Sequence, residues 1–472
     1  MSSSLVSEIF DRLEAGEKPP SPSPPSGGME PAPIQIPAEV WDARHELAQV
    51  RDAAWSRGRS ADAVLAGVLT RIAADTPHTL RLPPIVGAPC GLTLIGAING
   101  PPGSGKSAAK SIATSLLPAQ LLHPECDGAP PGSGEGLIEL LFGWVKEPDP
   151  DTGKNVRVHR QVHHNAYIYI DEGEVLTKLA GRQSSSTFLP TLRSAFTSGT
   201  LGQANASQER KRIVPAGQAV YGILLGIQPE LAGPIFDESG AGTPQRILWA
   251  SSTTPTPEPG SRPEWPGPLP RPTPSPQDWL AHQQQAPYLQ HEIGIPTSIS
   301  LEVAERDHRR QQHGAAHLDE HQDLIQLKVA ACLALLQGRL DINEADWQVA
   351  GLITDTSRQV RNQLIGQLAE AAAKTEAETS RRLARRQVEA VRHTVEWKTV
   401  ETARTISRRV GREPGRLTRG KLRAGLAATQ RDVFDAAYDH AVAQQWIIER
   451  DEPGQGTSKQ RLHPGTSQDD IR

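Results

Sequence analysis

A glycine-rich segment, Gly100-Pro-Pro-Gly-Ser-Gly-Lys-Ser107, has the composition and spacing of a loop that binds phosphate groups. Its sequence matches the pattern G-x-x-x-x-G-K-[ST], in which glycines let backbone N–H groups surround the phosphates. Lys106 is expected to reach the β- and γ-phosphates, and the Ser107 hydroxyl to bind Mg²⁺. We therefore expect ATP and Mg²⁺ as cofactors, with the nucleotide held by Gly100, Pro101, Pro102, Gly103, Ser104, Gly105, Lys106, Ser107 and Ala108.

This motif needs a strand before it and a helix after it. The apolar run Gly91–Ile98 predicts a short buried strand, and Ser107–Leu116 is rich in Ala, Ser and Leu, as a helix would be. A helix that begins at the loop would add its positive dipole end to the phosphate site. The alternative is an ordinary turn of glycine and proline before a helix.

A second apolar run, Ala166–Ile170, ends in the acidic pair Asp171-Glu172 and is the expected Walker B strand. Asp171 is expected to coordinate the metal, and Glu172 to polarise the attacking water as general base. Pro130–Gly136 repeats the spelling of the glycine-rich motif but places Glu135 where the lysine would be, so it is not a second phosphate loop. Glu135 remains an alternative catalytic base, because RecA-like motors often carry this residue after the second strand.

Hydrolysis also needs a polar sensor and a positive charge near the γ-phosphate. Gln228 follows the apolar strand Val220–Ile227 and is the expected sensor; a simple turn residue before Pro229 is the alternative. The arginine-finger candidates are Arg193, Arg210, Arg212 and Arg246. We favour Arg246, which is expected to open the last strand at the active edge of the sheet, although each of them could be a surface arginine.

Composition narrows the class of protein. A chain of 472 residues with 40 Pro and 41 Gly predicts several domains joined by linkers. Three cysteines without metal-ligand spacing, no long apolar run and no signal peptide predict a cytoplasmic protein without a membrane segment.

The charge is distributed unevenly. The chain carries a net charge of −4, yet residues 381–431 hold 15 Arg and Lys against 4 Asp and Glu. This local excess predicts that the C-terminal part contacts DNA. A solvated, arginine-rich helix is the alternative. The residues expected to contact DNA are Arg381, Arg382, Arg385 and Arg386, together with the winged helix described next.

The predicted fold class is α/β: a RecA/AAA-like P-loop NTPase core with a parallel sheet, a helical region and a C-terminal winged helix-turn-helix. Residues 396–464 suggest the last of these, with helices at Thr418–Leu426 and Thr429–Gln445, and a wing loop at Asp451–Lys459. Winged helices also bind proteins, so this domain does not by itself indicate DNA. The expected segments are a disordered arm and linker (1–37), a helical lead-in (38–90), the ATPase core (91–252), a Pro-rich linker or surface belt (253–276), a helical domain (277–395), the winged helix (396–464) and a disordered tail (465–472). Within the helical domain we expect two long helices, Asp319–Gln337 and Asn343–Leu368, followed by a basic helix from Thr375 to about Val395.

The same motifs, in this order, resemble a P-loop ATPase family of bacterial plasmid, phage and integrative-element replication genes, with primase-helicase members. The resemblance rests on the glycine-rich motif, Gly132–Gly136, Ile170–Glu172, Thr187–Arg193, Gly226–Glu230, Gly242–Arg246, Leu327–Ala331 and Ala345–Trp347. It implies an oligomeric motor, such as a hexamer, that acts on DNA at replication initiation. The chain has no room for a primase domain before the ATPase, so no priming activity is expected.

Three hypotheses of function follow. The first is a DNA-associated ATPase, a helicase or replication-initiation motor of a mobile genetic element. The second is an ATP-dependent switch or loader that acts on a protein partner, with the winged helix as docking module. The third is a DNA-binding regulator with a degenerate ATPase, which the intact Lys106, Ser107, Asp171 and Glu172 disfavour.

Overall fold

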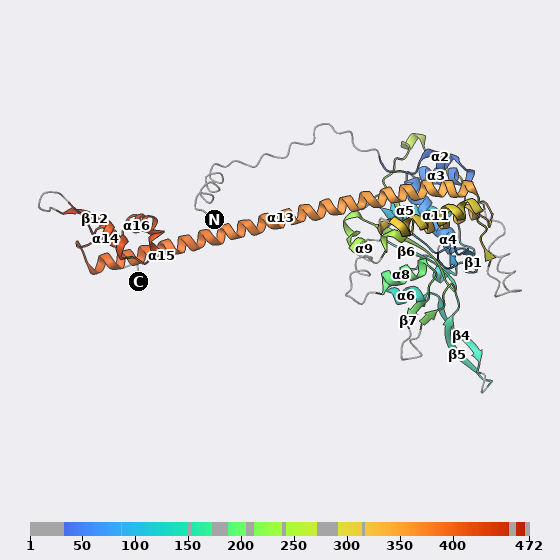
Figure 1. The fold of residues 1–472 in the computed structure, drawn as a ribbon, viewed down its shortest axis with the longest axis horizontal. Coiled ribbons are helices and arrows are strands. Elements are labelled where there is room, and N and C mark those ends of the chain that lie inside the picture. The colour runs from blue at the N-terminus through green and yellow to red at the C-terminus, as the bar shows by residue number, and fades with distance from the viewer. Residues whose placement is uncertain are drawn as a thin grey trace. The chain divides into compact units, whose positions relative to one another are not determined.

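The computed structural model describes residues 33–85, 87–149, 153–171, 187–203, 212–237, 242–270, 291–313, 317–452 and 459–467. The chain forms two compact units, Met1–Leu368 and Ala369–Arg472 (Figure 1). The boundary falls inside one helix, α13 (Glu344–Arg412), and not at the predicted limits of the helical domain. The expected N-terminal arm up to residue 32 and the tail from residue 468 lie outside the described residues.

The first unit is built around a sheet of four parallel strands. These are β3 (Leu94–Asn99), β6 (Asn165–Ile170), β9 (Val220–Ile227) and β10 (Ile247–Ser251), in the spatial order β10-β3-β9-β6. All eight residues of β9 and all six of β3 are buried, as expected for parallel strands that helices cover on both faces. The predicted α/β class with a parallel sheet is confirmed.

Two groups of helices cover the sheet. Helix α4 (Ala61–Ala74) packs so closely on one face that a Cβ on Gly222 would lie 1.9 Å from the carbonyl oxygen of Thr70. On the neighbouring residue, Tyr221, the hydroxyl donates to the carbonyl oxygen of Leu137 in α6 (Gly134–Glu139). Because adjacent residues of a strand point to opposite faces, α4 and α6 lie on opposite sides of the sheet.

The residues that the structure describes add further elements to this unit. Its remaining α-helices are α2 (Ala38–Asp42), α3 (His45–Ser56), α5 (Lys106–Leu116), α8 (Phe188–Phe196), α9 (Gly233–Asp237), α11 (Thr297–His313) and α12 (Gln322–Leu336). The 3₁₀ turns are η1 (Pro124–Cys126), η3 (Pro229–Leu231), η5 (Pro244–Arg246), η6 (Pro259–Ser261) and η7 (His317–Asp319). The small sheets are β11 (His291–Glu292) with β1 (Leu80–Leu82) and β2 (Cys90–Gly91), the hairpin β4 (Phe142–Pro148) with β5 (Asn155–Gln161), and β7 (Leu201–Gln203) with β8 (Arg212–Val214).

Two predicted segments belong to the core of the first unit and are not separate from it. The lead-in, 38–90, supplies α4, which contacts all four strands of the parallel sheet. The described part of the Pro-rich tract lies on the same core: the side chain of Gln49 donates to the carbonyl oxygens of Gly267 and Pro268, and the Leu269 amide donates to Leu116. Of the two interpretations of this tract, the structure favours the belt.

The predicted break between the helix at Asn343–Leu368 and the basic helix from Thr375 does not exist, because α13 continues through both. The residues between them, Ala369–Lys374, are alanines, Glu and Lys, which have high helix propensity and give no reason to stop. The helix begins with a reciprocal cap, in which the amides and side chains of Asn343 and Asp346 bond to each other. Its early turns cover the edge of the sheet, where the Trp249 amide donates to the Ser357 hydroxyl oxygen.

The second unit contains the end of α13, helices α14 (Arg419–Gly425), α15 (Ala428–Arg431) and α16 (Phe434–Ala443), and the antiparallel pair β12 (Ile447–Glu452) and β13 (Lys459–Pro464). The predicted helix Thr429–Gln445 is therefore two helices: the chain leaves helical geometry at Val433, whose ψ is 12°. The turn is fixed by Arg431, which donates to carbonyl oxygens of Ala424 and Leu426 in and after α14. Residues 453–458 of the expected wing loop lie outside the described residues.

In the part of the chain that the structure describes, no helix combines the length and apolar character that crossing a membrane requires.

Candidate functional site

The glycine loop, Gly100–Gly105, joins the carboxyl end of β3 to the first turn of α5. Gly103 and Gly105 have φ angles of 76° and 91°, in the left-handed region that glycine adopts without strain. The Gly100 amide donates to the carbonyl oxygen of Ile227, so the loop rests on the end of β9. The predicted strand, loop and helix are all present, and the middle of the loop is exposed at Pro101, Pro102 and Gly103.

Lys106 begins α5 and is 7% exposed. Its ammonium group donates to the carbonyl oxygens of Gly100 and Pro101 at 2.8 and 2.9 Å, so its head lies inside the loop. Burial lowers the pKa of Lys106, while the negative charges of Asp171 and Glu230 act in the opposite direction. A phosphate group in the loop would offer this ammonium group a charged acceptor in place of the two carbonyl oxygens.

Asp171, the first residue after β6, meets Ser107 across the sheet edge. The Ser107 hydroxyl donates to a carboxylate oxygen of Asp171 at 2.5 Å, although the two residues are 64 positions apart. Both are oxygen ligands of the kind that Mg²⁺ binds, and Ser107 is exposed, which leaves room for water and phosphate oxygens around an ion. The residues therefore fit the expected magnesium ion.

Gln228 lies at the same edge, because β9 runs parallel to β3 and β6 and ends between them. It is half-buried, next to the residue that holds the Gly100 amide. Its predicted position at the strand tip is confirmed, and its sensor role stays a prediction. Glu172 lies outside the described residues.

Glu135 lies in the first turn of α6. One of its carboxylate oxygens accepts from the Thr187 hydroxyl at 2.9 Å. Burial raises the pKa of Glu135, but hydrogen bonds from its own amide, Thr187 and Ser133 outweigh this effect and lower the pKa overall. The repeated segment Pro130–Gly136 thus contains a capped helix start, with Ser133 accepting from the Gly136 amide. No described contact joins Glu135 to the glycine loop.

The expected location of Arg246 is wrong. Arg246 precedes β10, and Ile247 pairs with Ile95 whereas Ser251 pairs with Asn99 beside the glycine loop. Arg246 therefore lies at the amino edge of the sheet. From the rise per residue of a strand, it is about 15 Å from the end of β10 that lies beside the glycine loop. Burial and the charge of Arg193 lower the pKa of Arg246, while Glu320 acts in the opposite direction. Arg246 therefore lies too far from the glycine loop of its own chain to contact a phosphate there.

The other finger candidates also make bonds within their own unit. Arg193 donates to the Thr243 hydroxyl at 2.8 Å, and Arg212 pairs with Glu139 at 2.6 Å. Arg210 lies outside the described residues. Nothing in these contacts selects one finger.

Sequence reasoning missed Arg59, a cation beside the glycine loop. A Cβ on Gly105 would lie 2.7 Å from the Cδ atom of Arg59. The next residue, Ser60, caps α4 and donates to the carbonyl oxygen of Ser251 at 2.6 Å, which fixes this segment to the end of β10. Arg59 belongs to no motif, so only the contact between distant segments reveals it.

The carboxyl end of β10 also supports the loop. The Ser252 hydroxyl bonds to the Ser104 hydroxyl at 2.6 Å and to the carbonyl oxygen of Asn99 at 3.1 Å. A Cβ on Gly100 would lie 1.9 Å from the same Ser252 oxygen, so any larger residue there would displace the Ser252 side chain from its bonds to the loop.

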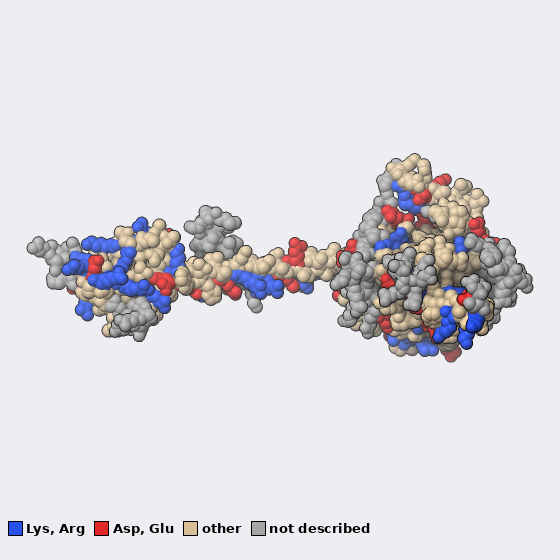
Figure 2. Space-filling model, turned by 90° about the horizontal axis from the view of Figure 1, so that it is seen from below, with Lys and Arg blue, Asp and Glu red and all other residues tan. Residues whose placement is uncertain are grey.

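Cations gather on the second unit. The α13 arginine cluster, Arg381, Arg382, Arg385 and Arg386, is exposed, and so are Arg416, Arg419, Lys421 and Arg423 in and before α14. Figure 2 shows Lys and Arg over much of the visible face of this unit. Helix α16 differs: it exposes Asp435 and Asp439 and has no Lys or Arg. The cations therefore lie on α13 and α14, and two of those on α14, Arg419 and Arg423, pair with Asp435 of α16 at 2.8 and 3.5 Å.

Comparison with protein-family models and with curated proteins found no match to this chain.

Proposed function

We propose that this chain binds ATP with Mg²⁺ at the glycine loop and hydrolyses it. The observation that carries the proposal is the bond between Ser107 and Asp171 beside the buried head of Lys106. It joins a phosphate-loop hydroxyl to the acidic end of a buried strand. Ligands of open parallel sheets bind outside the carboxyl ends of the strands, where these three side chains meet. The strand order, with β9 between the loop strand and the acidic strand, supports the RecA/AAA-like class.

In this proposal each residue has a defined role. Backbone amides of the loop and the start of α5 bind the phosphates, and Lys106 neutralises their charge. Ser107 and Asp171 hold Mg²⁺, which would offset charge on the β- and γ-phosphates. Glu172 is the proposed base, with Glu135 as the alternative, and Gln228 orients the water. An arginine of a neighbouring subunit would complete the site in a homo-oligomer.

We further propose that hydrolysis serves a DNA-associated motor, a helicase or replication-initiation ATPase of a mobile genetic element. The support is the exposed α13 arginine cluster and the cations of α14, which suit a polyanion. The acidic face of α16 disfavours a groove-reading role for that helix, so the DNA contact is assigned to α13 and α14. The resemblance of the motif order to replication ATPases agrees with this assignment.

One observation favours the second candidate, a switch or loader that acts on a protein. The same exposed stretch of α13 carries large apolar side chains, namely Leu383, Val388, Val391, Val395 and Trp397. Apolar side chains on an exposed helix are typical of a surface that a protein partner covers.

ATP turnover with and without DNA separates the two candidates. The purified chain should hydrolyse ATP, Lys106→Ala should abolish hydrolysis, and Lys110→Ala in the same helix serves as the matched control. Stimulation by DNA and strand displacement would support the motor. Hydrolysis that DNA does not change, with a protein partner captured only in the ATP state, would support the loader. Absence of saturable ATP–Mg²⁺ binding would refute both.

A further inference from the structure

The hairpin β4–β5 has one aromatic and basic face. In an antiparallel pair, directly opposite residues project to the same side, and Trp144 is opposite His159 while Lys146 is opposite Arg157. The rings of Trp144 and His159 lie 4.8 Å apart, and the Arg157 guanidinium lies 5.3 Å from the Trp144 ring. Phe142 stacks on the other side of His159 at 5.5 Å. We call this surface the Trp144 face.

The Trp144 face is open. Trp144 is 60% exposed, and Lys146 and Arg157 are exposed beside it. Burying a tryptophan is favourable, so a large exposed ring that neighbouring cations surround on a projecting hairpin is typical of a binding surface. Figure 1 shows β4 and β5 extending away from the parallel sheet of the same unit.

The charge on this face is positive. The two strands place Phe142, Trp144, Lys146 and Pro148 on this side, with Asn155, Arg157, His159 and Gln161 opposite them, and none of these is acidic. Glu147 is on the reverse side, where it pairs with Arg160 at 2.8 Å. At the base of the hairpin, Glu139 bonds to His159 and Arg212, so its charge is compensated.

We propose that the Trp144 face binds single-stranded DNA, with a base stacked on Trp144 and the phosphates beside Lys146 and Arg157. Single-strand sites combine aromatic platforms with cations that follow the backbone, and this face supplies both. A duplex hides its base faces, so it cannot use the ring in this way. The inference deepens the proposed DNA-associated function, on which the choice of DNA rests, and assigns a contact in the first unit.

The hairpin is also tied to the proposed ATP site. Its base is closed by the amides of Val162 and His163, which both donate to the carbonyl oxygen of Leu141. Two residues later the chain enters β6, which ends at Ile170, directly before Asp171. A DNA strand bound on the hairpin would therefore contact a segment that leads directly into β6 and Asp171.

The test is binding of a fluorescent oligothymidylate by the full chain without nucleotide, followed by anisotropy. Base stacking of the usual strength predicts that Trp144→Ala raises Kd by between about 5-fold and 150-fold. Trp144→Phe should restore most of the affinity. Arg157→Ala should make the negative slope of log K against log salt shallower by about 0.7. Arg160→Ala, which removes one cation from the reverse face, is the matched control and should leave Kd close to that of the wild type.

Each outcome has a defined meaning. Equal Kd values for the wild type and Trp144→Ala, or a Trp144 effect of the same size on blunt duplex DNA, would overturn the inference. If ATP hydrolysis is normal in the wild type and Trp144 does not affect oligonucleotide binding, only this inference fails. If oligonucleotide binding depends on Trp144 but the wild type neither binds nor hydrolyses ATP, only the proposed ATPase function fails.

Discussion

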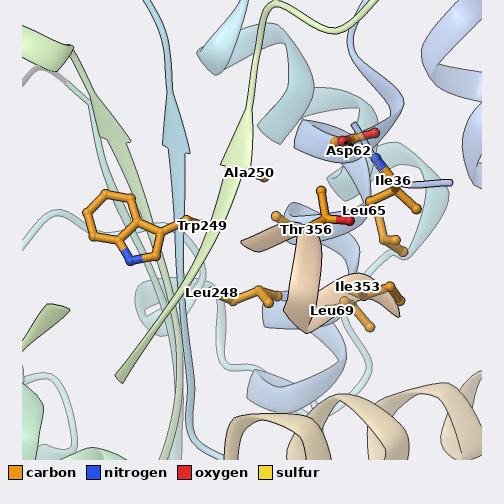
Figure 3. A pocket seen from close by; sticks show the side chains of 10 residues that line it. Ile36, Asp62, Leu65, Leu69, Leu248, Trp249, Ala250, Ile353 and Thr356 are labelled. Carbon is orange, nitrogen blue, oxygen red and sulfur yellow. Dashed lines mark hydrogen bonds between the residues drawn. The ribbon is translucent and has the colours of Figure 1, made fainter. Parts of the chain in front are cut away.

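The buried carboxyl group of Asp62 should make the stability of the first unit depend on pH. Asp62 is in the first turn of α4, and one of its oxygens accepts from the Ile36 amide at 2.9 Å. It lines a small cavity with apolar side chains from α4, β10 and α13 (Figure 3). Burial raises the pKa of Asp62 to about 7, against the opposing effect of the Ile36 and Asp62 amides. The group matters for the site because Arg59 and Ser60 lie only three and two residues before it.

The direction of the effect follows from proton binding. In the unfolded chain Asp62 ionises near its ordinary pKa of 3.8, whereas in the folded chain it keeps its proton up to about 7. Its contribution to stability is complete below the lower pKa and is lost as the pH rises through the higher one. Between about pH 5.5 and 7, one bound proton separates the two states, so the unfolding free energy should fall by about 2 kcal/mol.

Asp62→Asn removes this dependence, because the amide stays neutral and its oxygen can still accept from Ile36. The gap in unfolding free energy between the variant and the wild type should therefore widen by about 2 kcal/mol in favour of the variant from about pH 5.5 to 8.5. Urea denaturation of the full chain, followed by tryptophan fluorescence across this range, measures the gap. Asp42→Asn, at a carboxylate whose side chain is 70% exposed, is the control and should show no such widening. Parallel pH profiles for Asp62→Asn and the wild type would refute the reasoning.

Further predictions concern the site, the core and the second unit. Arg59→Ala should weaken ATP binding by about 10-fold through loss of one charge-assisted contact, measured by titration with ATP–Mg²⁺; an unchanged Kd would remove Arg59 from the site. Asp171→Asn should abolish hydrolysis while ATP still binds without Mg²⁺, and normal turnover would contradict the metal assignment. Arg71→Leu should lower the unfolding free energy by about 3 kcal/mol in urea, because it leaves Asp127 without the guanidinium that holds it at 2.8 and 2.9 Å; retained stability would show that the pair contributes little. Replacing the α13 arginine cluster by glutamine should reduce the salt slope of duplex binding by about 3 to 4, and an unaltered slope would argue for the loader.

Local patterns in the sequence were sufficient to predict much of the parallel sheet and the glycine loop. Val220–Ile227 is a strand with the predicted bounds, and the loop lies between a strand and a helix as expected. Such elements are predictable because consecutive apolar residues bury a strand and glycines permit a tight turn, whatever the rest of the chain does. The pairing of Ser107 with Asp171 could be anticipated as well, because both follow the carboxyl ends of parallel strands.

Other features depended on contacts between distant segments. The direction in which β10 pairs with β3 decided that Arg246 lies at the amino edge, and a list of candidate arginines holds no such information. The packing of the segment after α3 on the glycine loop brought Arg59 to the site. The register of β4 and β5 placed Trp144, Lys146 and Arg157 on one face. The sequence thus determined which local elements form, and the tertiary structure decided which side chains meet, because strand direction, register and helix packing are set by residues far apart in the chain.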